Sequence, residues 1–125
     1  MGDYYQALLD KFVDDMYLIS RGVRSVCMHT IEYYSEDEYK TKDKIKPLMR
    51  QIRKHAKHWK LYVYPSHTHN SEGYFTTIFV YKYPHQKQII KFAEDTFIIQ
   101  EIKEWMIGKL LGYSDESIEE FINYI

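Results

Sequence analysis

The residues best suited to chemistry in this sequence are the lysines and arginines between Lys40 and Lys60. Nine basic residues stand there against a single acid, Asp43, so this segment carries a net charge of +8. The rest of the chain holds eight basic and seventeen acidic residues, so the total of −1 conceals two poles of opposite charge. A basic pole of this density can neutralise the phosphates of a nucleic acid, or bind an acidic protein surface that mimics one. The alternative is a solvated helix face that lies against the chain's own acidic helices.

Aromatic residues follow the basic segment. Tyr62 and Tyr64 share one face of an expected strand, and four aromatic residues share one face of the next: Phe75, Phe79, Tyr81 and Tyr83. If the two faces coincide and are exposed, they form a platform for stacking bases or an anchor for a protein interface. If helices cover them, the same residues belong to the core. We expect burial for Phe75 and Phe79, whereas the sequence leaves the four tyrosines open.

The histidines are candidates for metal binding. His67 and His69 lie in the expected hairpin loop, and His55 and His58 are spaced i, i+3 on the basic helix. A metal site needs three or four convergent ligands, commonly with a carboxylate such as Glu72. Solvated loop histidines are more common, so we expect no metal.

The single cysteine could act as a nucleophile. Cys27 and His29 fall on the same side of an expected strand, which would suit a thiol–imidazole pair. A buried cysteine that acts as a small apolar side chain is far more common. The sequence contains no phosphate-binding glycine loop, no nucleophile elbow, and no metalloprotease or kinase signature. We therefore expect a protein that is not an enzyme and has no cofactor.

The predicted binding surface combines the outer face of the basic helix with the neighbouring tyrosines and histidines. Its residues are Lys46, Arg50, Arg53, Lys54, Lys57, Tyr62, Tyr64, His67 and His69. The acidic pole is the alternative contact surface, because it could mimic phosphates for a basic groove of a partner. Its main residues are Asp115, Glu116, Glu119 and Glu120. Charge alone does not decide between the two poles.

The spacing of apolar residues predicts an α+β fold with a small antiparallel sheet of two or three strands and four to five helices. Helices are expected over residues 3–19, 43–59, 86–94, 96–111 and 115–124. Strands are expected over 61–64 and 74–83, joined by a loop over 65–73. Residues 23–34 fit a helix or a strand, and their β-branched and aromatic composition favours a strand. Residues 35–38 are expected to form a surface turn.

Several helix ends are also predicted. Asp3 and Asp43 are expected as N-caps of the first helix and of the basic helix, and Ser114 as the N-cap of the last. Gly22 and Gly112 are expected just beyond the ends of two helices, where glycine is favoured.

Length and composition set the remaining expectations. A chain of 125 residues, 45% of them hydrophobic, can bury one core, so residues 1–125 are expected to form a single domain. No apolar run approaches the roughly 20 residues that cross a bilayer. One cysteine excludes an intramolecular disulfide, so a reducing cytoplasm is expected. A small sheet has edges that a homodimer could cover, so the sequence favours neither a monomer nor a homodimer as the oligomeric state.

The segment IGKLLGYSDESIEEFI, from Ile107 to Ile122, resembles the C-terminal ends of small proteins encoded by phages and prophages of low-GC Gram-positive bacteria. The resemblance covers 16 of 125 residues and transfers no functional residue. It implies a host-takeover or anti-defence factor, such as an anti-CRISPR protein that binds and blocks a nuclease complex in the host cytoplasm.

The leading hypothesis is therefore a non-catalytic inhibitor that binds a host protein or nucleoprotein complex through the basic helix and the aromatic hairpin. The first alternative is a protein that binds nucleic acid directly with the same surface. A small metal-dependent or Cys-dependent enzyme is the third reading.

Overall fold

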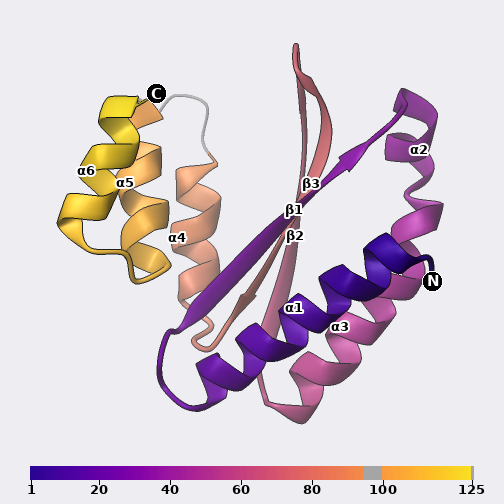
Figure 1. The fold of residues 1–125 in the computed structure, drawn as a ribbon, viewed down its shortest axis with the longest axis horizontal. Helices are drawn as coiled ribbons and strands as arrows, with labels where there is room; N and C mark the ends of the chain where they lie inside the picture. The colour runs from indigo at the N-terminus through magenta and orange to yellow at the C-terminus, as the bar shows by residue number, and fades with distance from the viewer. Residues whose placement is uncertain (95–99, 125) are drawn as a thin grey trace.

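The computed structural model describes residues 1–94 and 100–124, and Figure 1 shows their arrangement. The elements are α1 (Asp3–Ser20), β1 (Val26–Tyr33), α2 (Glu36–Thr41), the 3-10 turn η1 (Asp43–Ile45), α3 (Lys46–His58), β2 (Tyr62–Asn70), β3 (Gly73–Tyr81), α4 (Gln86–Ala93), α5 (Gln100–Leu110) and α6 (Asp115–Tyr124). The α+β class with a small antiparallel sheet is confirmed, and the ambiguous segment before residue 34 is a strand.

The sheet has three antiparallel strands in the order β1-β3-β2. The central strand β3 pairs Val80 with Cys27 of β1 on one side and with Val63 of β2 on the other. Both β1 and β2 are therefore edge strands. Because neighbouring residues of a strand point to opposite faces, the register sends Ile78 and Val80 to one face and Phe79 and Tyr81 to the other.

Helices α1 and α3 lie side by side on the first face of the sheet (Figure 1). Their apolar stripes meet the sheet in the larger core, whose most buried members are Phe12, Met16, Ile19, Ile31, Leu48, Ile52, Ile78 and Val80. The helix predicted over 3–19 is confirmed, and the helix predicted over 43–59 is confirmed from Lys46 onward. Burying one face of α3 leaves its lysines and arginines on the opposite, solvated side.

Helices α4 and α5 cover the other face at one end of the sheet. The buried residues of this smaller cluster are Val26, Phe79, Tyr81 and Ile90, with Met28, Tyr64, Ile107, Leu110 and Leu111 packed around them. Phe79 is buried, as predicted, whereas Phe75 is only half-buried. Tyr81 also belongs to this core, while Tyr62 and Tyr83 are exposed.

The β2–β3 hairpin is longer than predicted, and it extends past α1 and α3 in Figure 1. Residues 65–70 continue β2, so the predicted loop over 65–73 is wrong and only Ser71 and Glu72 form the turn. Pro65 suggests a loop because it lacks an N–H donor. It is tolerated here because β2 is an edge strand, with one side of its backbone outside the ladder. His67 and His69 consequently lie on a strand.

The predicted surface turn over residues 35–38 is also wrong, because Ser35 caps the short helix α2. The Ser35 hydroxyl accepts a hydrogen bond from the Glu38 N–H at 3.2 Å, and the Glu38 carboxylate accepts one from the Tyr34 N–H at 3.2 Å. This is close to a capping box, whose S-x-x-E pattern is present in the sequence.

Two of the predicted N-caps are wrong. Asp3 is the first residue of α1, and Gly2 holds the cap position. Asp43 opens the 3-10 turn, and its carboxylate accepts a hydrogen bond from the Lys46 ammonium group at 2.8 Å, so α3 begins after Ile45 without a side-chain cap. The sequence pattern located both helix starts correctly, but it did not identify which residue stands at the cap position.

The other predicted helix ends are confirmed. Gly22 and Gly112 have φ of 78° and 84° just beyond α1 and α5. The Ser114 hydroxyl accepts a hydrogen bond from the Ser117 N–H at 3.2 Å at the start of α6. Helix α5 is described from Gln100, and positions 96–99 of the helix predicted over 96–111 lie outside the described residues.

Candidate anion-binding groove

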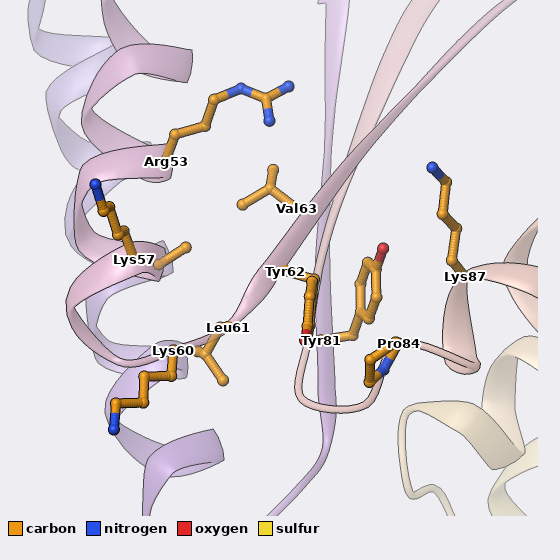
Figure 2. Close-up of a pocket in the computed structure, with 10 residues that line it drawn as sticks. Arg53, Lys57, Lys60, Leu61, Tyr62, Val63, Tyr81, Pro84 and Lys87 are labelled. Atoms are coloured by element: carbon orange, nitrogen blue, oxygen red, sulfur yellow. The ribbon is translucent and has the colours of Figure 1, made fainter.

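A cavity of about 600 Å³ lies along the edge of β2, between α3 and α4 (Figure 2). Four cationic side chains, two tyrosines and four apolar residues line it: Arg53, Lys57, Lys60, Lys87, Tyr62, Tyr81, Ala56, Leu61, Val63 and Pro84. Among the residues that the structure describes, no acidic residue lines the cavity. We call this cavity the cationic groove.

Helix α3 contributes one wall of the cationic groove. Arg53 and Lys57 are four residues apart, so their side chains lie on the same side of the helix. The buried stripe of Ile52 and Ala56 anchors α3 to the sheet. In Figure 2 the Arg53 side chain extends toward β2, whereas the Lys57 ammonium group points away from the strand. The amphipathic pattern of the helix thus determines where these two charges lie.

Lys60 lines the groove at the end of α3, with a φ of 58° in the left-handed region, and its ammonium group points away from Tyr62 in Figure 2. Its N–H and that of Leu61 donate to carbonyls one turn earlier, at 3.1 and 2.8 Å, which is the Schellman pattern. The same pattern closes α1 and α5, where Gly22 and Gly112 take the left-handed position. A residue with a Cβ costs roughly 1–2 kcal/mol more than glycine in this conformation. Lysine at position 60, in place of glycine, therefore adds a cation to the lining of the groove but lowers the stability of the fold.

The floor of the groove is aromatic. Tyr62 and Tyr81 are cross-strand partners with ring centroids 5.6 Å apart and ring planes at 20°. Tyr81 is 3% exposed, and burial raises the pKa of its hydroxyl. Tyr62 is 45% exposed at the sheet edge. The buried ring fixes the exposed one, so Tyr62 offers a rigid surface for stacking.

Helix α4 contributes the opposite wall through Lys87, and Lys91 follows one turn later. Their ammonium groups lie 5.6 and 5.9 Å from the ring centroid of Tyr64, within the range of cation–π contacts. Burial raises the pKa of the Tyr64 hydroxyl, and the Glu94 carboxylate adds to the effect. Tyr64 therefore stays neutral beside two cations, which extends the positive surface beyond the groove.

The positive charge of the Lys40–Lys60 segment is unevenly compensated. Three lysines near its start form ion pairs: Lys40 with Glu36 at 3.1 Å, Lys44 with Glu38 at 2.5 Å, and Lys46 with Asp43 at 2.8 Å. Within residues 1–94 and 100–124, no ion pair involves Arg53, Lys57, Lys60 or Lys87. Of the six cations of the segment that form no ion pair in the described part of the chain, three line the groove: Arg53, Lys57 and Lys60.

The structure brings together only part of the predicted binding surface. Arg53, Lys57 and Tyr62 line the groove, and Tyr64 lies next to it. Lys46 is held by Asp43, and Lys54 is exposed on α3 outside the groove. Arg50 lines a different cavity, on the side of α3 that faces the start of α1.

The predicted histidines are not part of the groove. His67 and His69 point to the face of the sheet opposite Tyr62, and His67 is about 17 Å further along β2 at 3.3 Å per residue. The His67 ring accepts or donates a hydrogen bond with the Thr76 hydroxyl at 2.8 Å, and burial lowers its pKa. The His69 ring packs against Tyr39 and Tyr74. In the described part of the chain, no three His, Cys, Asp or Glu side chains are grouped closely enough to hold a metal ion.

Cys27 is buried under α1, and burial raises the pKa of its thiol to about 12. His29 is engaged by Asp15, with 2.8 Å between the ring nitrogen and the carboxylate oxygen. A thiol that stays protonated is a poor nucleophile, and its neighbouring imidazole already has a partner.

Of the residues that line the groove, the predicted binding surface contained only Arg53, Lys57 and Tyr62. It lacked two cations, Lys60 and Lys87, and also Tyr81, Ala56, Leu61, Val63 and Pro84. Lys60 belongs to the basic segment, whereas Lys87 comes from a helix that follows the hairpin. The left-handed position after a helix could have marked Lys60 as unusual. No local pattern marks Lys87, because only the packing of α4 on the sheet brings it to β2.

Comparisons with protein-family models, with curated proteins and with solved structures found no match. Among the described residues, none of the helices has the length and apolar character to cross a membrane. Fold and site together define an α+β protein with a cationic, aromatic groove at one edge of its sheet.

Proposed function

We propose that this protein is a non-catalytic interaction module that binds a nucleoprotein complex and contacts the nucleic acid with the cationic groove. The observation that carries the proposal is that Arg53, Lys57, Lys60 and Lys87 line one groove with the exposed Tyr62, and that no acidic residue lines it among residues 1–94 and 100–124. Several cations along one surface without a counter-ion create a positive potential, which attracts an anionic ligand.

The aromatic component favours a nucleic acid over a simple anion. A base can stack on an exposed aromatic ring, and the neighbouring lysines and arginine can neutralise the phosphates on either side of it. Tyr62 is held rigidly by Tyr81, so stacking would cost little side-chain entropy. An unpaired strand suits this groove best, because its bases are accessible to the ring.

The biological setting follows from the resemblance of residues 107–122 to small phage and prophage proteins. In that setting the module acts as an anti-defence inhibitor that occupies a nucleoprotein machine of the host cytoplasm. No covalent step is required, because occupation of the target is sufficient for inhibition.

A test captures partners from a lysate of a low-GC Gram-positive bacterium with the tagged protein, with and without nuclease. Two triple variants with the same change in charge accompany it. The groove variant is Arg53→Gln, Lys57→Gln and Lys60→Gln, and the control variant is Lys11→Gln, Lys40→Gln and Lys109→Gln. All six side chains are exposed, so neither variant should disturb the fold.

We expect a nucleoprotein that is captured by the unaltered protein and the control variant, and that is lost both with nuclease and with the groove variant. Capture by the groove variant at the level of the unaltered protein would overturn the proposed contact surface. A partner that survives nuclease but is lost with the groove variant would identify a protein as the direct ligand.

The open edge of β2 supports that second candidate. β2 pairs only with β3, so an extended acidic peptide could add to the sheet and place its carboxylates between Arg53 and Lys87. A short acidic peptide that competes with a single-stranded oligonucleotide, and binds more tightly than it does, would favour this candidate.

A further inference from the structure

An apolar cavity of about 470 Å³ lies between the edge strand β1 and the helices α5 and α6, on the side of the sheet away from α1 and α3 (Figure 1). Its main apolar side chains are Met28 of β1, Ile107 and Leu111 of α5, and Ile118 and Phe121 of α6. We call this cavity the apolar groove. It shares no residue with the cationic groove.

Helix α6 packs on α5 and leaves part of its apolar face uncovered. A Cβ at Gly108 would lie 2.6 Å from Cγ1 of Ile118, so the bare backbone of Gly108 lets α6 approach α5 closely. Ile118 is buried by this contact, whereas Phe121 is 51% exposed although it lines the groove. An exposed aromatic ring beside an apolar cavity is a surface that a partner can cover.

The apolar groove lies on the outer side of β1. Met28 is the cross-strand partner of Phe79 in β3, yet no residue of β3 lines the groove in the part of the chain that the structure describes. The groove therefore extends from Met28 away from β3. It leads to the edge of the sheet, because β1 is the outermost strand on this side.

The backbone of β1 can pair with an added strand at the same place. The Lys82 N–H donates a hydrogen bond to the Ser25 carbonyl at 2.9 Å, which identifies these two residues as a hydrogen-bonded pair. Such pairs alternate along an antiparallel ladder, so Met28 and Thr30 direct their N–H and C=O groups to the open edge. Within residues 1–94 and 100–124, no backbone hydrogen bond from a turn or loop reaches these groups.

The charge beside the apolar groove is negative. Among the described residues, Glu104 is the one charged residue that lines the groove, and it forms no ion pair there. Its carboxylate accepts a hydrogen bond from the Gln100 amide at 2.5 Å, which leaves the negative charge in place. Helix α6 adds four acids and no basic residue: Asp115, Glu116, Glu119 and Glu120.

This charge decides between two kinds of occupant. A symmetric pair of β1 strands from two copies of the chain would bring two acidic α6 helices to the same face of one sheet, where they repel each other. A segment with basic side chains is attracted instead. The complementary partner is therefore a different protein that presents positive charge.

We propose that the apolar groove and the open edge of β1 bind an extended segment of a partner protein, in which a large apolar side chain lies between basic ones. The segment adds to β1 through the backbone groups of Met28 and Thr30. Its apolar side chain enters the groove beside Phe121. Since residues two apart on a strand share a face, the basic side chains lie on the same side as Glu104. None of these contacts depends on the proposed function of the cationic groove.

The test is an NMR titration of the full chain that follows the Met28 methyl group and the Met28 and Thr30 amides. The probe is the peptide acetyl-Thr-Lys-Thr-Leu-Thr-Lys-Thr-amide, and its matched versions have alanine for leucine or glutamate for both lysines. We expect saturable shifts with the probe, about tenfold weaker binding of the alanine peptide, and no saturable shift with the glutamate peptide. A probe that binds no better than the alanine and glutamate peptides, or that shifts only β2, would overturn the proposal.

Pairing with the backbone is tested by methylation of single amides of the probe. Neighbouring amides of an added strand point in opposite directions, so only one of two adjacent amides can donate to β1. One peptide is methylated at the leucine amide and another at the amide of the threonine that follows. One of the two should lose binding and the other should keep it. Binding that survives both methylations would overturn the addition of a strand.

Variants of the protein locate the site. Phe121→Ala should weaken binding of the probe about tenfold, whereas Phe92→Ala, a similarly exposed phenylalanine of α4 outside the groove, should not. Glu104→Gln should weaken it about fourfold, which is the effect of one unit charge at about 5 Å in water. Its control is Glu101→Gln, an exposed acid of α5 outside the groove.

Two results of these experiments would overturn the site or its occupant. Unchanged binding in both Phe121→Ala and Glu104→Gln would mean that the probe lies elsewhere. A dimer of the chain that the probe dissociates, measured by analytical ultracentrifugation, would mean that a second copy occupies the edge of β1. A circular dichroism spectrum of each variant separates loss of the site from loss of the fold.

Discussion

Removal of the groove cations should flatten the dependence of nucleic-acid binding on salt. Binding of a single strand weakens with salt with a log–log slope of about −0.7 for each phosphate that is neutralised. The four cations of the groove set an upper limit of four such phosphates, so the slope is about −2.8. Between 50 and 200 mM salt the affinity should then fall about 50-fold.

The groove variant, in which Arg53, Lys57 and Lys60 become Gln, leaves only Lys87 of this set. Its slope should be about −0.7, which corresponds to a loss of about threefold over the same range of salt. The assay is fluorescence anisotropy of a labelled single-stranded oligonucleotide at four or more salt concentrations. The control variant of Lys11, Lys40 and Lys109 has the same net charge but should keep the steep slope.

Two results would refute this reasoning. A groove variant whose slope is as steep as that of the unaltered protein would mean that the phosphates contact other cations. A control variant that loses its slope as well would mean that net charge, and not the placement of the charges in the groove, governs binding. A circular dichroism spectrum of each variant verifies that the fold is unchanged.

Three further predictions concern the fold around the sites. Lys60→Gly should raise the free energy of unfolding by about 0.5–1 kcal/mol, because glycine relieves a backbone cost of about 1–2 kcal/mol but gives the unfolded chain more freedom. It should also reduce the salt slope of binding; chemical denaturation and anisotropy measure the two effects. Gly108→Ala should destabilise the protein by about 1–3 kcal/mol in chemical denaturation, because a Cβ there would lie 2.6 Å from Cγ1 of buried Ile118. Burial lowers the pKa of His67, so the unfolded chain takes up a proton first and stability should fall as pH drops below about 6.5; urea denaturation at pH 7.5 and 5.0 should show this loss, and His67→Gln should reduce it while His58→Gln should not.

Each of these three can fail in a defined way. A Lys60→Gly variant that is less stable than the unaltered protein would mean that the side chain makes a stabilising contact that outweighs the backbone strain. Unchanged stability in Gly108→Ala would mean that α5 and α6 can separate without cost. A pH dependence that persists in His67→Gln would have to come from another titrating group.

Local patterns in the sequence predicted most of the fold. The stripe of Leu48, Ile52 and Ala56 identified α3 and its buried face, because a helix brings residues three and four apart to one side. Gly22 and Gly112 marked two helix ends, because the left-handed backbone beyond a helix favours glycine. These patterns involve residues within one or two helical turns of each other, so they can be recognised without the tertiary structure.

The two errors have different causes. Pro65 and the polar residues around His67 resemble a loop, but pairing with β3 extends β2 through them, and this pairing is visible only once the chain is folded. Ser35 and Glu38 form a local capping pattern that the sequence already contains, and the acidic residues around it favoured the prediction of a surface turn.

The sequence by itself determined that this protein has a strongly basic helix followed by an aromatic hairpin, because charge and periodicity are properties of consecutive residues. Only the tertiary structure decided which of those charges act together. Packing of α4 on the sheet brought Lys87 to the same groove as Arg53 and Lys57, and the pleat of β2 sent His67 away from Tyr62. A binding site is a convergence of side chains in space, and convergence depends on register and packing between elements that are far apart in the chain.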